Sequence, residues 1–133
     1  MKDLVNTREE NDYWYFSGSY GELIDSFEIE TLIEVHDHDY QGDSRYLFKS
    51  GEEYGILIFG WGSCSGCDSL EACSTFEEVV RLRDVLWDST EWHTFDDMKT
   101  YVETRDWEGQ YFYHDKESKE FINAVKSYFG VEL

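Results

Sequence analysis

Acidic side chains dominate this sequence and set the first constraint on how it folds. Its 133 residues include 30 Asp and Glu but only 11 Lys and Arg, so the formal net charge is −19 with His neutral. Repulsion among like charges weakens a compact state, and such a chain folds only if it buries enough apolar surface to compensate. Hydrophobic residues make up 41% of the chain and aromatic residues 18%. We therefore predict a single domain with a packed core rather than a disordered acidic tail.

The charge also restricts the class of partner. Affinity for phosphates depends on clustered Lys and Arg, so we expect no direct binding to nucleic acid or to an anionic membrane. No apolar run approaches the roughly 20 residues that span a bilayer, and residues 1–12 lack the apolar segment of a secretory signal. The expected partner is therefore a basic protein surface, and the expected location is the cytoplasm.

Hydrophobic periodicity predicts strands early in the chain. From Ile29 to Val35 the pattern has period two, with Ile29, Thr31, Ile33 and Val35 on one side and mostly Glu residues on the other, which is typical of a half-buried strand. Two apolar runs, 46–48 and 55–59, flank the Gly-containing turn 50–53 and predict a β-hairpin. The second run is apolar at every position, so we expect its strand to be buried on both faces.

Capping residues and helical spacing predict the remaining elements. Helices are expected after Ser19, over 76–88, after Thr94 and from Asp115 to Gly130, with a short edge strand at 110–113. Strands first and helices mostly afterwards favour an α+β fold class. The predicted architecture is an antiparallel sheet of three to four strands packed against C-terminal helices, in a single domain over residues 1–133.

An acidic surplus falls on the predicted first strand and the turn after it, because no Lys or Arg occurs from residue 9 to residue 44. If the apolar residues of this strand face the core, its Glu residues share the opposite face, about 6.6 to 7 Å apart at each i, i+2 step. This is about twice the axial phosphate step of one nucleic-acid strand, ~3.4 Å. The predicted partner-binding residues are Glu28, Glu30, Glu34, Asp37, Asp39 and Asp43, with Tyr40 and Trp107 as aromatic anchors.

All three cysteines lie in one Gly-rich segment, 59–73, between a buried strand and a helix. Close packing of its small side chains under Trp61 is the favoured interpretation. Thiol redox chemistry at the C-x-x-C motif is disfavoured because the chain has no proline to supply the cis-Pro of a thioredoxin fold. A tetrahedral zinc site is the alternative. Three of its ligands would be Cys64, Cys67 and Cys73. The fourth would be a histidine, and of the four in the chain, His36, His38, His93 and His114, we select His36 as the predicted ligand.

The run His36-Asp37-His38-Asp39 is a second candidate metal site. In an extended strand His36 and His38 project to the same face, so two imidazoles could share a metal. No further His or Asp ligand motif accompanies them, and a solvated turn is the favoured interpretation.

The segment 54–73, YGILIFGWGSCSGCDSLEAC, resembles a group of small uncharacterised proteins of bacteria and their phages, as do 40–43 upstream and 106–109 downstream. The resemblance implies no reaction, cofactor or catalytic residue. It implies a bacterial or phage cytosol, where small acidic proteins are often inhibitors of other machinery.

These observations predict a non-enzymatic acidic binding protein. The most concrete hypothesis is a phage or bacterial inhibitor of a defence or nucleic-acid-handling protein that acts by nucleic-acid mimicry. No signature pairs a nucleophile with a base, so no catalytic residue is predicted. The alternatives are a small zinc-binding protein built on the cysteines, with zinc as its cofactor, and a toxin-immunity-like protein that uses the same acidic surface.

Overall fold

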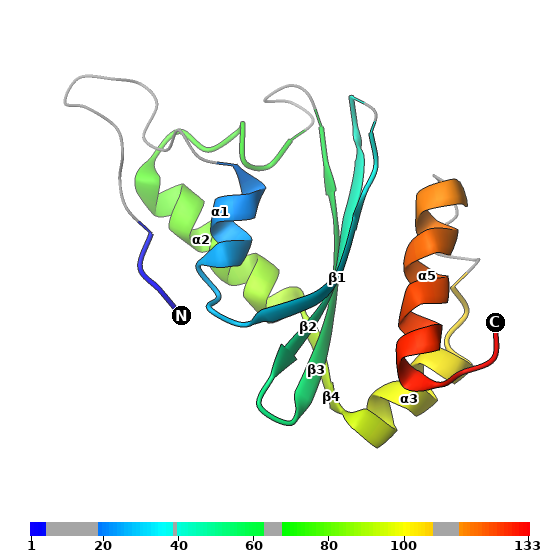
Figure 1. Ribbon diagram of the computed structural model, residues 1–133. Helices are drawn as coiled ribbons and strands as arrows, with labels where there is room; N and C mark the ends of the chain where they lie inside the picture. The colour runs from blue at the N-terminus through cyan, green and yellow to red at the C-terminus, as the bar shows by residue number, and fades with distance from the viewer. Residues whose placement is uncertain (5–18, 39, 63–67, 108–114) are drawn as a thin grey trace.

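The chain forms an antiparallel sheet with helices on both faces (Figure 1). The computed structural model describes residues 1–4, 19–38, 40–62, 68–107 and 115–133. The elements are α1 (Tyr20–Asp25), β1 (Glu30–His36), β2 (Gly42–Ser50), β3 (Glu53–Trp61), α2 (Phe76–Ser89), β4 (Glu91–Thr94), α3 (Phe95–Thr104) and α5 (Asp115–Phe129). The strand order is β1-β2-β3-β4, and each neighbouring pair is antiparallel. The predicted α+β class is therefore confirmed.

Side chains of the two central strands alternate between two cores. In β2, Phe48 packs in the core with α1 and α2, whereas Leu47 packs in the core with α3 and α5. In β3, Leu57 belongs to the first core and Ile56 to the second. Burial of β3 on both faces was predicted from its continuous apolar run, and β2 shares it.

The turn of the central hairpin follows from its glycine. Ser50 pairs with Glu53, so Gly51 and Glu52 form a two-residue loop. Gly51 has a φ of 61°, a left-handed conformation that favours glycine and matches the twist of the flanking strands. The predicted hairpin is thus confirmed at its turn.

Capping residues are found at the start of α2 and the end of α5, whereas Thr94, the predicted cap of α3, makes no side-chain capping bond. The Thr75 hydroxyl accepts the backbone N–H of Glu78 at 3.1 Å at the start of α2, as the sequence predicts. Gly130, with a φ of 71°, follows the last residue of α5. Ser19 precedes α1, but its side chain makes no capping bond, so the predicted capping box is absent there. Within the described residues, no helix is long and apolar enough to cross a bilayer.

One strand of the sheet is not predicted from the sequence. The four-residue strand β4 is too short for its alternation to be recognised in the sequence, and it forms the edge of the sheet beside β3. The expected strand at 110–113 lies outside the described residues. His114, one of the four histidines considered as a zinc ligand, lies outside them as well.

Truncating Leu47 and Phe48 separately tests the two-sided burial, because both side chains are 0% exposed. Leu47→Ala should lower the free energy of unfolding by ~2–5 kcal/mol and Phe48→Ala by ~3–5 kcal/mol, measured by urea denaturation. Val85→Ala, at a side chain that is 57% exposed, should change it by less than about 0.5 kcal/mol. A near-zero effect at Leu47 or Phe48 would contradict this arrangement.

Candidate functional site

The predicted row of carboxylates on β1 is interrupted within the strand. β1 begins at Glu30, so Glu28 precedes it, with a φ of 57° and its carboxylate 3.7 Å from the N-terminal ammonium of Met1. Between Thr31 and Ile33 the pairing with β2 shifts by one residue, which is a β-bulge. An inserted residue exchanges the faces of the side chains beyond it, so the alternation in the sequence does not continue through the strand.

Glu30 and Glu34 consequently point to opposite faces of the sheet. Directly paired residues share a face, and Glu30 pairs with Lys49 whereas Glu34 pairs with Tyr46. Tyr46 belongs to the core under α1 and α2. The Lys49 ammonium lies 5.7 Å from the ring centroid of Tyr54, which belongs to the core under α3 and α5. The prediction of a single carboxylate ladder with phosphate-like spacing is therefore wrong.

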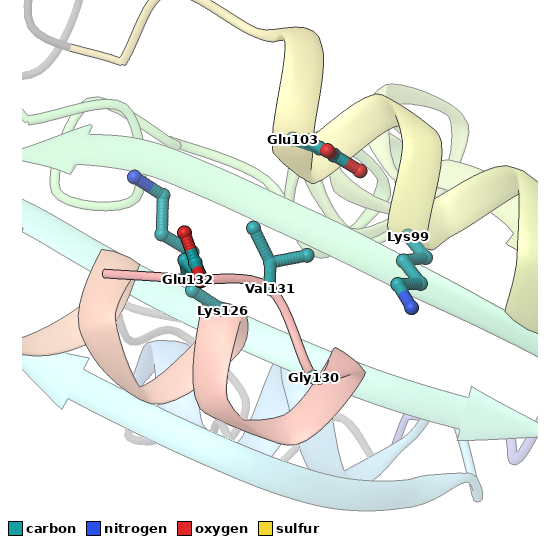
Figure 2. Close-up of a pocket in the computed structure, with 6 residues that line it drawn as sticks. All are labelled: Lys99, Glu103, Lys126, Gly130, Val131 and Glu132. Carbon is teal, nitrogen blue, oxygen red and sulfur yellow. The ribbon is translucent and has the colours of Figure 1, made fainter.

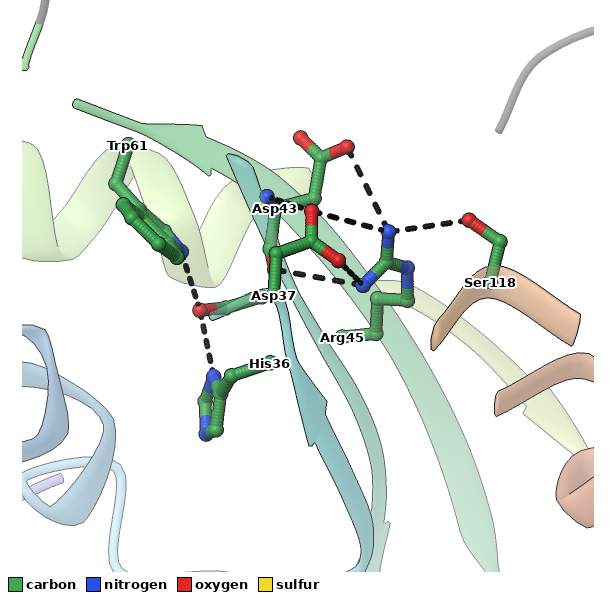
Figure 3. Close-up of polar contacts among 7 residues, drawn as sticks. His36, Asp37, Asp43, Arg45, Trp61 and Ser118 are labelled. Atoms are coloured by element: carbon green, nitrogen blue, oxygen red, sulfur yellow. Dashed lines mark hydrogen bonds and ion pairs between the residues drawn. The ribbon is translucent and has the colours of Figure 1, made fainter. Parts of the chain in front are cut away.

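His36 hydrogen-bonds through both ring nitrogens, and Figure 3 draws the bond of one of them. Its Nδ1 lies 2.7 Å from the Ser44 hydroxyl, which also accepts the indole N–H of Trp61 at 2.9 Å, and its Nε2 lies 2.6 Å from the Glu34 carboxylate. A neutral ring protonated at Nε2 satisfies both contacts. Zinc binding by His36 would have to replace one of these two hydrogen bonds.

Asp37 lies inside the protein rather than on a binding surface. Its carboxylate is 0% exposed and accepts a hydrogen bond from Arg45 at 2.9 Å, and the Arg45 side chain is itself 1% exposed. Asp37 also accepts the backbone N–H of Asp43 at 2.7 Å, and Arg45 donates to the Ser118 hydroxyl of α5 at 3.1 Å (Figure 3). Buried charges persist when they are paired and hydrogen-bonded. The predicted partner-binding role of Asp37 is therefore wrong.

Gly42 and Asp43, in the segment after Tyr40, lie against the buried ion pair of Asp37 and Arg45. A Cβ at Gly42 would lie 2.5 Å from the Asp37 side chain, so only glycine lets the turn close over the carboxylate. Asp43 keeps a side chain that is 29% exposed and 3.8 Å from the Arg45 guanidinium. Asp39 lies outside the described residues.

The two predicted aromatic anchors have opposite environments. Tyr40 is 87% exposed, at the end of the sheet where β1 connects to β2. Trp107 is 5% exposed, and its indole N–H donates to the Val102 carbonyl at 3.0 Å. Trp107 is therefore a core residue, and its prediction as an anchor is wrong.

Cys73 is a buried thiol in the turn that precedes α2. Its Sγ donates to the Ser69 carbonyl at 3.3 Å. Burial, followed by two nearby carboxylates, raises the pKa of the Cys73 thiol, whereas zinc binds the thiolate. Cys64 and Cys67 lie outside the described residues, and within the described ranges no three His, Cys, Asp or Glu side chains form a potential metal site.

Asp68 joins the end of β3 to the turn before α2. One carboxylate oxygen accepts the N–H of Gly62 at 2.8 Å. The other accepts the N–H groups of Leu70 and Glu71 at 2.8 and 3.0 Å and the Tyr20 hydroxyl at 2.9 Å. Sequence reasoning missed this role, although an Asp followed by N–H groups two and three residues on is the signal of an Asx turn.

Exposed carboxylates lie on both faces of the sheet where the β2–β3 hairpin meets β4: Glu53 shares the face of Trp92, and Glu91 shares the face of Ile56. Glu53 pairs with Thr94, which brings the hairpin beside the segment that links α2 to α3. Neither 50–62 nor 84–98 contains Lys or Arg. We call this group of exposed side chains the acidic edge: Glu52, Glu53, Asp88, Glu91, Asp96 and Asp97.

The charge surplus is not spread evenly over the helices. α5 contains three acids and three lysines, and its formal charge is zero. Next to the acidic edge, the Nε2 of His93 lies 3.7 Å from the Glu91 carboxylate, and Lys99 follows one turn into α3. Sequence reasoning missed this edge because its two segments come together only through the pairing of β3 with β4.

A hollow of ≈ 310 Å³ lies between α3 and the C-terminal end of α5 (Figure 2). Lys99 and Glu103 reach it from α3 and Lys126 from α5, and the C-terminal segment closes it with Gly130, Val131 and Glu132. Two lysines and two glutamates balance in charge, so this hollow does not extend the acidic edge.

Comparison with protein-family models, with curated proteins and with solved structures gives no match to this chain.

Replacing Asp37 by Asn tests the buried ion pair. Because the substitution leaves the Arg45 guanidinium buried without a full counter-charge, it should lower the free energy of unfolding by ~3–5 kcal/mol in urea. Asp43→Asn is the matched control at the other carboxylate near Arg45, and it should cost under about 1 kcal/mol. Equal effects of the two substitutions would show that Asp37 has no special role.

The raised pKa of Cys73 gives a pH dependence with a defined sign. As the pH rises past about 8.5 the unfolded thiol ionises before the folded thiol does, so the stability that this group contributes is complete below that pH and decreases above it. Cys73→Ala should remove this loss. The measurement is the urea midpoint of both proteins at pH 7 and pH 9.5, and parallel decreases would contradict the assignment.

Proposed function

We propose that this chain is an acidic binding protein that docks on a cationic protein surface. Its partner, in this proposal, is a nucleic-acid-binding protein of a bacterium or phage, whose basic cleft the chain occupies in place of nucleic acid. The observation that carries the proposal is the acidic edge, with six exposed carboxylates drawn from segments that contain no Lys or Arg.

The size of the charge supports a role in binding. A net charge of magnitude about 2 to 8 is enough to keep a small domain in solution, and this chain has −19. Excess charge of one sign accelerates the encounter with a partner of opposite sign, and added salt weakens this attraction. A cleft built for phosphates offers clustered Lys and Arg, which are the complement of such a surface.

Aromatic side chains at the same end of the molecule supply apolar contact. Phe95 is 41% exposed and Tyr128 is 40% exposed, and both rings lie 5.8 Å from that of Tyr54. Aromatic residues of this kind are common energetic centres of interfaces. Tyr40 stands at the other end of β2, which rises about 27 Å over its length, so its predicted anchoring role concerns a different part of the surface.

Neutralising the acidic edge tests the proposal. The edge variant replaces its six residues: Glu52→Gln, Glu53→Gln, Asp88→Asn, Glu91→Gln, Asp96→Asn and Asp97→Asn. The control variant replaces six exposed acids elsewhere: Asp3→Asn, Glu22→Gln, Asp25→Asn, Glu71→Gln, Glu120→Gln and Glu132→Gln. Both variants raise the net charge by six, so they differ only in where the carboxylates are removed.

The immobilised chain should capture a basic protein from bacterial lysate at low salt, and calorimetry with that purified protein gives the affinities. The edge variant should bind it at least about tenfold more weakly, and the control variant within about twofold of the original. Excess double-stranded DNA should displace the chain from its partner. Equal losses in the two variants would contradict a localised surface, and binding that DNA does not affect would contradict mimicry and favour the toxin-immunity alternative.

A further inference from the structure

A small hollow with two indole rings opens at the acidic edge. Its volume is ≈ 190 Å³, and it lies between the β2–β3 hairpin and the connection from α2 to β4. Its lining residues are Ser50, Glu53, Trp87 and Trp92. Both indoles are partly exposed, so they contribute aromatic surface to a hollow whose charged side chain is a carboxylate.

The two indoles are held from behind by the core. Their ring centroids lie 5.4 Å apart with an interplanar angle of 49°. Trp87 packs edge-on against Phe27 at 5.0 Å, and Trp92 stacks on Phe48 at 6.5 Å. Because Phe27 and Phe48 are themselves buried, the rings are fixed before any ligand arrives, which lowers the entropic cost of binding.

Gly55 provides the space in which Trp92 lies on the sheet. It pairs with Trp92 across β3 and β4, and a Cβ at this position would lie 2.8 Å from the indole ring. A glycine in the middle of a strand weakens the strand, and it is usually found where a neighbouring group packs closely against the backbone. The position of the indole beside the hollow accounts for it.

Charges around the hollow favour a cation. Glu53 lines it, and Asp88 follows Trp87 in the chain, whereas Glu91 pairs with Ile56 and shares its face of the sheet, opposite the hollow. Lys49, the chain neighbour of Ser50, points to the opposite face of the sheet, where its ammonium lies over the ring of Tyr54. The hollow thus combines aromatic faces with negative charge.

We propose that this hollow accepts one arginine side chain of the basic partner, with the guanidinium on the indoles and paired with Glu53. Tryptophan is the best aromatic partner for a cation, and arginine both stacks on rings and pairs with carboxylates in a planar fork. At ≈ 190 Å³ the hollow is smaller than the roughly 300–1,000 Å³ of small-molecule sites, which suits a single side chain. This inference rests on the proposed function and adds the chemistry by which the partner is recognised.

A short peptide tests the hollow without the partner. The probe is acetyl-Gly-Arg-Gly-amide, titrated into ¹⁵N-labelled protein while the indole N–H signals are recorded by NMR, with assignments from Trp87→Phe and Trp92→Phe. The signals of Trp87 and Trp92 should shift and saturate, and those of Trp61 and Trp107 should not. The same peptide with citrulline, which has the shape of arginine without its charge, should bind about tenfold more weakly.

Glu53→Gln should lower the affinity for the arginine peptide about tenfold, whereas Glu120→Gln, at an exposed carboxylate of α5 outside the acidic edge, should leave the affinity within about twofold. Both residues are exposed, so neither substitution disturbs the core. Equal binding of the citrulline peptide, or no effect of Glu53→Gln, would overturn the arginine site.

The outcomes separate this inference from the proposed function. If the arginine peptide binds as expected but the edge variant keeps full affinity for the partner, the proposed function fails and the hollow stands. If the edge variant loses the partner but the peptide does not bind and Glu53→Gln alone has no effect, the arginine site fails and the proposed function stands.

Discussion

The buried ion pair between Arg45 and Asp37 is the interaction on which the geometry of one end of the sheet depends. Moving two charges out of water is costly, and their attraction compensates only when further hydrogen bonds complete the site. Here Asp43 and Ser118 supply hydrogen bonds to the two side chains, while the buried Arg45 Nε has no partner among the described residues, and the pair connects the end of β1 with β2 and α5 (Figure 3). Gly42 makes the arrangement sterically feasible. The acidic turn at 37–43, which the sequence predicts as part of a binding surface, therefore has in part a structural role.

Covering both faces of the sheet explains how so acidic a chain folds. Each central strand contributes apolar side chains to two cores, which doubles the apolar area that the strand buries and offsets the repulsion of the surface. Apart from buried carboxylates such as Asp37 and Asp68, acidic side chains occupy helix exteriors and the margins of the sheet. On α5 lysines balance them, whereas at the acidic edge the local sequence supplies no Lys or Arg, and the proposed partner would supply the positive charge.

The hairpin that organises the fold also assembles the acidic edge. Gly51 sets the turn, Glu53 then faces Thr94 across the sheet, and Gly55 admits the ring of Trp92. The fold and the proposed recognition surface thus share the same few residues. The hollow beside Trp87 and Trp92 is rigid because its back wall is the core, so a partner side chain would meet a preformed site.

Local pattern in the sequence determined the helices, the hairpin turn and the α+β class, because capping at Thr75, the left-handed Gly51 and apolar periodicity act over a few residues. Pairing partners and strand register were decided only by the tertiary structure. A bulge in β1, which no local pattern signals, separated Glu30 from Glu34. The physical reason is that a side chain's face and its neighbours depend on contacts between distant segments, and neither periodicity nor composition encodes those contacts.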